Sequence, residues 1–214
     1  MKKYLHPLLA SPQCGDLRTV AFHEAGHAVV MHFNGRGPLY VAVLRKPDGY
    51  AGSTWPNESV DPNPFDAGTI GQEVEVALAG PLAEELHTGH WDDDGATGDV
   101  SHAMDLVRSA VCSSAADSKA YLERARDRIT EFLKVPAVWA AVSRLAAALV
   151  EEGKLRPVAG GFIEERMLRA ERVGELILKN NRGETPPALN EAYELLCARR
   201  NHDGGQRDCE SHAL

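Results

Sequence analysis

Two histidines and a glutamate near the N-terminus have the spacing of a zinc-dependent hydrolytic site. His23 and His27 are four residues apart, so on a helix their imidazoles lie on one face and can bind a single zinc ion. Glu24 directly follows the first histidine, and from this position its carboxylate can reach a metal-bound water as a general base. A purely structural zinc domain is disfavoured, because such sites are normally closed by four Cys or His ligands and do not use a base.

The two histidines supply only part of a catalytic zinc site. Such zinc ions usually have three protein ligands and keep the fourth position for water or substrate. The spacing alone does not identify the third ligand. The candidates are acidic or histidine residues that follow in the chain: Glu84, Glu85, His87, His90, Asp92, Asp93, Asp94, Asp99, His102 and Asp105.

A helix is predicted from Asp16 to about Asn34, and it carries the histidine pair. Apolar residues recur there at spacings of three and four, Asp16 can cap the start, and Gly35 follows the end. A small hairpin is predicted over Tyr40–Trp55, where β-branched and aromatic residues flank a Pro-Asp-Gly turn. Together these elements give a helix followed closely by a short sheet.

The rest of the chain is predicted to be mainly helical. A helix that starts near Asp66 should kink or break at Pro81, and a Gly- and Asp-rich loop should follow over Thr88–Gly98. Four more helical patterns cover 99–113, 116–134, 136–152 and 161–179. The predicted fold class is therefore mainly α with a small β-hairpin or sheet.

Composition limits the environments and partners of the chain. The net charge of −8 over 214 residues disfavours nucleic acid, and no window approaches the roughly 20 apolar residues that span a bilayer. We therefore expect no membrane insertion. The cysteines are scattered and form no C-x-x-C pair, which favours reduced thiols and a cytoplasmic location: Cys14, Cys112, Cys197 and Cys209. We divide the chain into an N-terminal extension (1–15), one domain (16–179) and a polar, flexible tail (180–214), in which 188–198 is a candidate for one short helix.

The sequence around the histidines resembles the zinc helix of the FtsH-type membrane AAA protease family. The residues Thr19–Ala28 read T-V-A-F-H-E-A-G-H-A, against T-A-Y-H-E-A-G-H-A in that family. The likeness continues in order along the chain. Tyr40–Thr54 resembles the family's hairpin, Ala77–Leu86 resembles its L-x-G-R-A-A-E-E segment, and Ala96–Asp99 resembles its S-T-G-A-x-x-D region. The resemblance covers roughly residues 16–170 and implies a zincin-like peptidase domain.

The resemblance also implies a third ligand. In the family this ligand is the aspartate that opens a helix of the form D-[IL]-x-x-A-[ST]-x-L, and Asp99 starts the matching stretch. Two residues of the family pattern are missing before Asp99, and aligning on Thr97-Gly98 instead places His102 at the ligand position. Glu84 and Glu85 match acidic family positions near the metal, where a carboxylate can orient a ligand imidazole; Glu84 is the preferred candidate.

The predicted function is that of a zinc metalloendopeptidase with one Zn²⁺ per chain. Glu24 would act as general base on unfolded or small polypeptides, without ATP, since the sequence has no G-x-x-x-x-G-K-[ST] phosphate loop. A separate ATPase or adaptor could deliver substrates, and the sequence favours neither a monomer nor a small oligomer. The alternative function is a zinc-binding interaction or regulatory module that keeps the peptidase fold without appreciable turnover.

Overall fold

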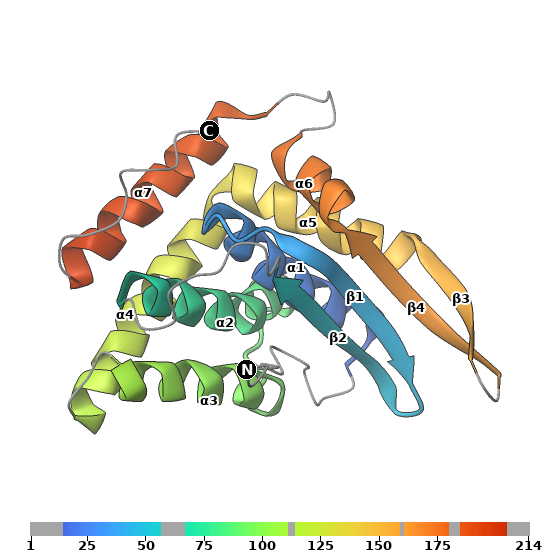
Figure 1. The fold of residues 1–214 in the computed structure, drawn as a ribbon, viewed down its shortest axis with the longest axis horizontal. Coiled ribbons are helices and arrows are strands. Elements are labelled where there is room, and N and C mark those ends of the chain that lie inside the picture. The colour runs from blue at the N-terminus through green and yellow to red at the C-terminus, as the bar shows by residue number, and fades with distance from the viewer. Residues whose placement is uncertain (1–14, 57–66, 111–113, 159–160, 180–184, 205–214) are drawn as a thin grey trace, which may run out of the picture.

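The computed structural model describes residues 15–56, 67–110, 114–158, 161–179 and 185–204 (Figure 1). The elements follow one another in this order: α1 (Leu17–Phe33), β1 (Pro38–Lys46), β2 (Gly49–Pro56), α2 (Ala67–Thr88), α3 (Asp93–Ala110), α4 (Ala115–Lys134), α5 (Pro136–Glu151), β3 (Gly153–Val158), β4 (Gly161–Arg169), α6 (Ala170–Leu178) and α7 (Pro187–Gly204). The predicted class, mainly α with a small sheet, is confirmed.

Helix α1 is the centre of the fold and is covered on several sides. It packs against α2, α5 and the strands β1 and β2 (Figure 1). Most of its residues are buried, and many of them are small, including Ala21, Ala25 and Ala28. Small side chains let neighbouring backbones come close to α1. The polar side chains of His23, Glu24 and His27 on the same helix are therefore enclosed and buried. Its predicted start is confirmed, because Asp16 accepts hydrogen bonds from the backbone N–H groups of Arg18 and Thr19.

The sheet is antiparallel, with the strand order β2-β1-β4-β3 (Figure 1). The predicted hairpin is confirmed as β1–β2. The prediction of one helix over Gly161–Lys179 is wrong, because the first part of this segment forms strand β4 and only the second part forms helix α6. Strand β4 pairs with β1 on one side and with β3 on the other, and Leu168 is buried. On the side of β1 its backbone hydrogen bonds are therefore satisfied by a strand distant in sequence, which a local helical pattern cannot reveal.

Helices α2 and α3 both extend further than predicted. Helix α2 continues through Pro81 without a break, because Leu78, Leu82 and Ala83 on either side of the proline are buried in the core. Helix α3 begins at Asp93 rather than at Asp99, so much of the predicted loop Thr88–Gly98 is helical. The tertiary contacts of α2 and α3 thus outweigh the local preference of proline and glycine to break a helix.

The start of α3 is held by Asp92. The Asp92 side chain accepts a hydrogen bond from the Asp94 N–H (3.1 Å), and its backbone carbonyl accepts one from the Ala96 N–H (2.9 Å). Gly95 has no side chain that would collide with this carboxylate, since a Cβ there would lie 2.7 Å from Asp92 Oδ2. The acidic residues and the glycine that suggest a loop therefore form the first turn of a helix.

Helix α7 lies inside the segment predicted as a tail. Its Leu189 and Leu196 belong to the core, and Tyr193 stacks on Phe33 of α1 with the ring centroids 5.8 Å apart.

Among the helices that the structure describes, none is by itself both long and apolar enough to cross a membrane. Only α4 and α5 taken together reach that length and composition, across a bend of 82°.

Candidate metal centre

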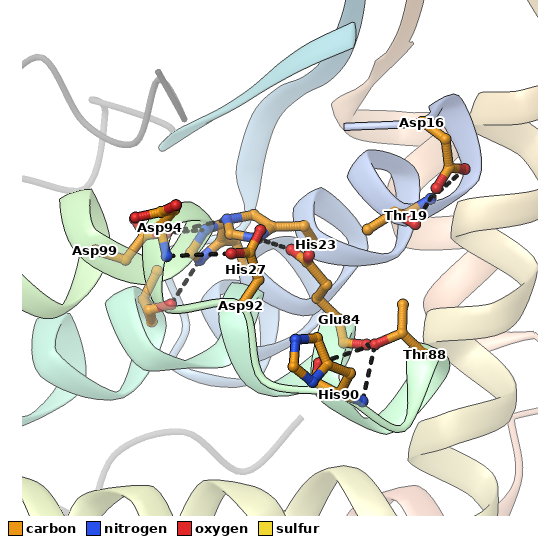
Figure 2. A network of polar contacts seen from close by, with 11 residues as sticks. Asp16, Thr19, His23, His27, Glu84, Thr88, His90, Asp92, Asp94 and Asp99 are labelled. Carbon is orange, nitrogen blue, oxygen red and sulfur yellow. Dashed lines mark hydrogen bonds and ion pairs between the residues drawn. The ribbon is translucent and has the colours of Figure 1, made fainter. Parts of the chain in front are cut away.

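Three buried side chains from α1 and α3 converge on one point. His23 Nε2 lies 3.0 Å from Asp99 Oδ2, and His27 Nε2 lies 3.6 Å from the same oxygen (Figure 2). Zinc bonds of 2.0–2.2 Å in a tetrahedron put neighbouring ligand atoms about 3.3 Å apart, so these separations match the edges of such a site. Within the described part of the chain, these are the three residues that form a potential metal-binding group.

The outer ring nitrogens fix how the two imidazoles point. His23 Nδ1 lies 3.0 Å from Glu84 Oε2, and His27 Nδ1 lies 2.7 Å from the backbone carbonyl of Val76. If each Nδ1 carries the proton and donates it outward, each Nε2 has a lone pair for an ion held between the two histidines and Asp99. His27 Nε2 is buried and has no hydrogen-bond partner in the described structure. A metal ion would satisfy this nitrogen, so the donor set fits zinc.

The electrostatics of the cluster favour a positive charge between the three groups. Burial alone would lower the pKa of His23, but hydrogen bonds to Asp99 and Glu84 outweigh it and raise this pKa to about 10. Burial would raise the pKa of Asp99, whereas the charge of His27 and the hydrogen bond from His23 bring it well below its ordinary value. Without a metal the cluster therefore retains a proton. Metal binding has to displace that proton.

Glu24 lies beside this cluster, on the side of the sheet. Its side chain is fully buried, and burial raises the pKa of its carboxyl above the ordinary value. Thr54 Oγ1, on β2, lies 2.7 Å from Glu24 Oε2 and donates a hydrogen bond to it. The other oxygen, Oε1, has no partner among the described residues. Glu24 therefore has one oxygen held by Thr54 and one buried oxygen without a hydrogen-bond partner.

Two glycines allow α2 to approach α1 closely at the cluster. A Cβ on Gly80 would lie 2.2 Å from His27 Nε2 and 2.7 Å from His23 Nε2. A Cβ on Gly26 would lie 2.4 Å from the backbone oxygen of Ala79. Both glycines therefore permit close packing of α2 against α1. At Gly80 the space is needed by the imidazoles themselves.

The remaining candidates lie apart from the three converging groups. Glu85 forms an ion pair with Arg126 (3.0 Å) on the surface of α2, so the two neighbouring glutamates have different surroundings. His102 lies on α3 near Asp99, is half-buried, and does not belong to the group of three. The others include His87, which stacks on Phe22 with ring centroids 3.7 Å apart, and His90, Asp92, Asp93, Asp94 and Asp105, which are exposed.

Sequence reasoning missed three groups that touch the site. They are the carbonyl of Val76, the hydroxyl of Thr54 and the space at Gly52, where a Cβ would lie 2.2 Å from Glu24 Cγ. Every residue has a backbone carbonyl, so the residue type at Val76 does not indicate this contact. The contact of Thr54 and Gly52 with Glu24 depends on how the sheet packs on α1. The alternation along the predicted hairpin could at most have placed Gly52 and Thr54 on the same face.

Comparison with known proteins shows that the sequence of this chain is similar to a family of peptidases. The model of peptidase family M41 matches residues 14–151, which include α1 to α5 and every residue of the cluster. An ATP-dependent zinc metalloprotease FtsH from Magnetococcus marinus is 33% identical over 99 residues, 46% of this chain and 15% of the relative. A protein of the same name from Heterosigma akashiwo is 37% identical over 98 residues, 44% of this chain and 14% of the relative. The matched part is thus a small fraction of either relative.

Proposed function

Because the chain belongs to peptidase family M41, we propose that it is a zinc metalloendopeptidase that cleaves unfolded or small polypeptides without ATP. Family membership supports a metallopeptidase with a polypeptide substrate. The observation that carries the proposal is the convergence of His23, His27 and Asp99 next to the buried carboxylate of Glu24. Hydrolysis at such a site needs only a metal ion, a water and a base, so no nucleotide enters the chemical step.

We assign the metal ligands to His23, His27 and Asp99, with one zinc ion per chain. A zinc ion held by these residues would lower the pKa of a bound water towards about 7 and would polarise the carbonyl of the scissile bond. Glu24 takes a proton from the attacking water on Oε1, the oxygen without a hydrogen-bond partner, and passes it to the leaving amine. Glu84 and the Val76 carbonyl hold the imidazoles in the orientation that this reaction needs.

Strand β2 offers a binding edge for an extended substrate. It is the first strand in the order β2-β1-β4-β3, and the N–H and C=O of Tyr50 point away from β1, since both bond to Gly15. Backbone groups alternate along a strand, so those of Gly52 and Thr54 point the same way. An added substrate strand would be held there by its backbone, largely independently of its sequence. This edge directly adjoins Glu24.

The experiment that tests the proposal is cleavage of an unfolded protein such as casein by the purified chain. We expect cleavage without ATP, loss of cleavage after a chelator removes the metal, and recovery when zinc is added back. Glu24→Gln should keep its zinc and lose cleavage. If the wild-type chain binds zinc but cleaves nothing with or without ATP, the proposal is wrong and a non-catalytic binding module is the better description. A cytoplasmic location is part of the proposal and rests on the scattered cysteines.

A further inference from the structure

The carboxylate of Glu24 is held from the sheet side by β2. Thr54 Oγ1 lies 2.7 Å from Glu24 Oε2 and 3.2 Å from the Glu24 backbone carbonyl, and both residues are 0% exposed. A hydroxyl has a single proton to donate, and the shorter contact is the one to the carboxylate. A hydrogen bond to a charged group in a buried site is also the stronger kind. The hydroxyl of Thr54 therefore restrains one oxygen of Glu24.

Gly52 makes room for the same carboxylate. A Cβ at this position would lie 2.2 Å from Glu24 Cγ and 2.3 Å from Glu24 Oε1. Gly52 and Thr54 are two residues apart on one strand, so they present the same face to α1. One residue leaves space for the carboxylate and the other fixes its orientation. As a result Oε2 is engaged, whereas Oε1 has no partner among the described residues.

We propose that Thr54 is a positioning residue for Glu24, holding its Oε2 so that Oε1 is the oxygen that receives the proton of the attacking water. The proposal rests on the hydrolytic function proposed above and adds a residue to its machinery. A buried carboxylate beside a cation site has a competing option, which is to turn towards the cation as a further ligand. The bond to Thr54 holds Oε2 on the side of β2 and so opposes such a turn of the carboxylate.

The test compares two substitutions that differ in the hydroxyl. Thr54→Val removes the hydroxyl and keeps the branched shape, whereas Thr54→Ser keeps the hydroxyl. For Thr54→Val we expect kcat on an unfolded substrate to fall about 10- to 100-fold, the effect of a hydrogen bond to a charged group, with KM and zinc content unchanged. Thr54→Ser should stay close to wild type. Ser53→Ala is the matched control, because Ser53 neighbours Thr54 on β2 but points to the other face.

Several results would overturn the proposal. An unchanged kcat in Thr54→Val, or an equal fall in Thr54→Val and Thr54→Ser, means that the hydroxyl does not act through Glu24. Loss of zinc in Thr54→Val means that Thr54 supports the metal site instead. If Thr54→Val does not fold, Thr54→Ala and Thr54→Ser give the same comparison. A wild-type chain that cleaves nothing refutes the hydrolytic function, and the role of Thr54 with it; a wild-type chain that cleaves as fast as Thr54→Val refutes the role of Thr54 alone.

Discussion

His23 and His27 are held by partners of different chemistry. The outer nitrogen of His23 bonds to the carboxylate of Glu84, whereas that of His27 bonds to the backbone carbonyl of Val76. A carboxylate increases the basicity of the imidazole and orients it, and it can be changed by mutation, which a backbone carbonyl cannot. The contribution of an orienting group to metal affinity is therefore best measured at Glu84.

Replacing Glu84 by Gln should weaken zinc binding about 10- to 100-fold, the usual effect of losing such a partner. The measurement is a competition titration of the purified chain against a zinc chelator of known affinity. Glu85→Gln is the control, because Glu85 is paired with Arg126 and not with a histidine. Equal losses in the two variants would contradict the role given to Glu84.

Replacing Gly80 by Ala should reduce both zinc content and stability, since the added methyl group would lie 2.2 Å from His27 Nε2. Overpacking of this kind typically costs about 1–3 kcal/mol. Gly174→Ala on α6 is the matched control: nothing lies near its missing side chain, and removing a helical glycine should stabilise by roughly 0.5–1 kcal/mol. Zinc analysis and urea unfolding test both variants, and a fully loaded Gly80→Ala would contradict this explanation.

At this scale the sequence predicted the residues that carry their own chemical signature. The histidine pair and Glu24 follow from spacing alone, and the resemblance to a family pointed to Asp99 over His102. The structure brings Asp99 to the histidines, although it lies inside α3 and not at its start. The roles of Thr54 and Val76 could not be predicted from the sequence, because their contacts depend on how β2 and α2 pack against α1.

At the scale of elements, the start of α1 depends on the Asp16 side chain. Replacing Asp16 by Ala should cost about 1 kcal/mol, the usual value of an N-cap. The hydrogen bond from the Thr19 hydroxyl lowers the pKa of Asp16 below its ordinary value of 3.8. Since the folded-state pKa is the lower one, this stabilisation is present above pH 3.8 and is lost as the pH falls through the folded-state pKa.

The measurement is urea unfolding of wild type and Asp16→Ala over a range of pH. The difference in the free energy of unfolding should be largest near neutral pH and should shrink in acid. A difference that stays constant down to low pH would show that the Asp16 carboxylate does not cap α1.

Elements were predictable where their pattern is local and failed where distant contacts decide. Helix α1 and the β1–β2 hairpin have clear periodicity, a cap and a turn. In 161–179 the apolar residues Val173 and Ile177 fit the helix that forms there, but Leu168 is buried in a strand through pairing with β1. At Pro81 a kink or break of the helix was predicted, but α2 continues, because residues on both sides of the proline are buried in the core. Both errors have the same cause, namely tertiary contacts that override local preference.

At the scale of the whole molecule, a buried ion pair joins α2 to α4. Arg128 Nε and Glu75 Oε1 lie 3.4 Å apart, with exposed side-chain fractions of 6% and 0%. Arg128→Met removes the guanidinium that faces the buried carboxylate of Glu75, so it should cost about 3–5 kcal/mol in the free energy of unfolding. The double variant Glu75→Leu/Arg128→Met should cost less than Arg128→Met alone. Urea unfolding measures both, and a double variant that is less stable still would contradict this explanation.

The most direct test of the metal centre is the zinc content of purified wild type, Asp99→Ala and His102→Ala, measured together with cleavage of casein. Wild type and His102→Ala should each hold about one zinc per chain and cleave, whereas Asp99→Ala should lose both the ion and the activity, as expected for loss of one of three protein ligands. If Asp99→Ala keeps its zinc and its activity while His102→Ala loses them, the ligand assignment is wrong.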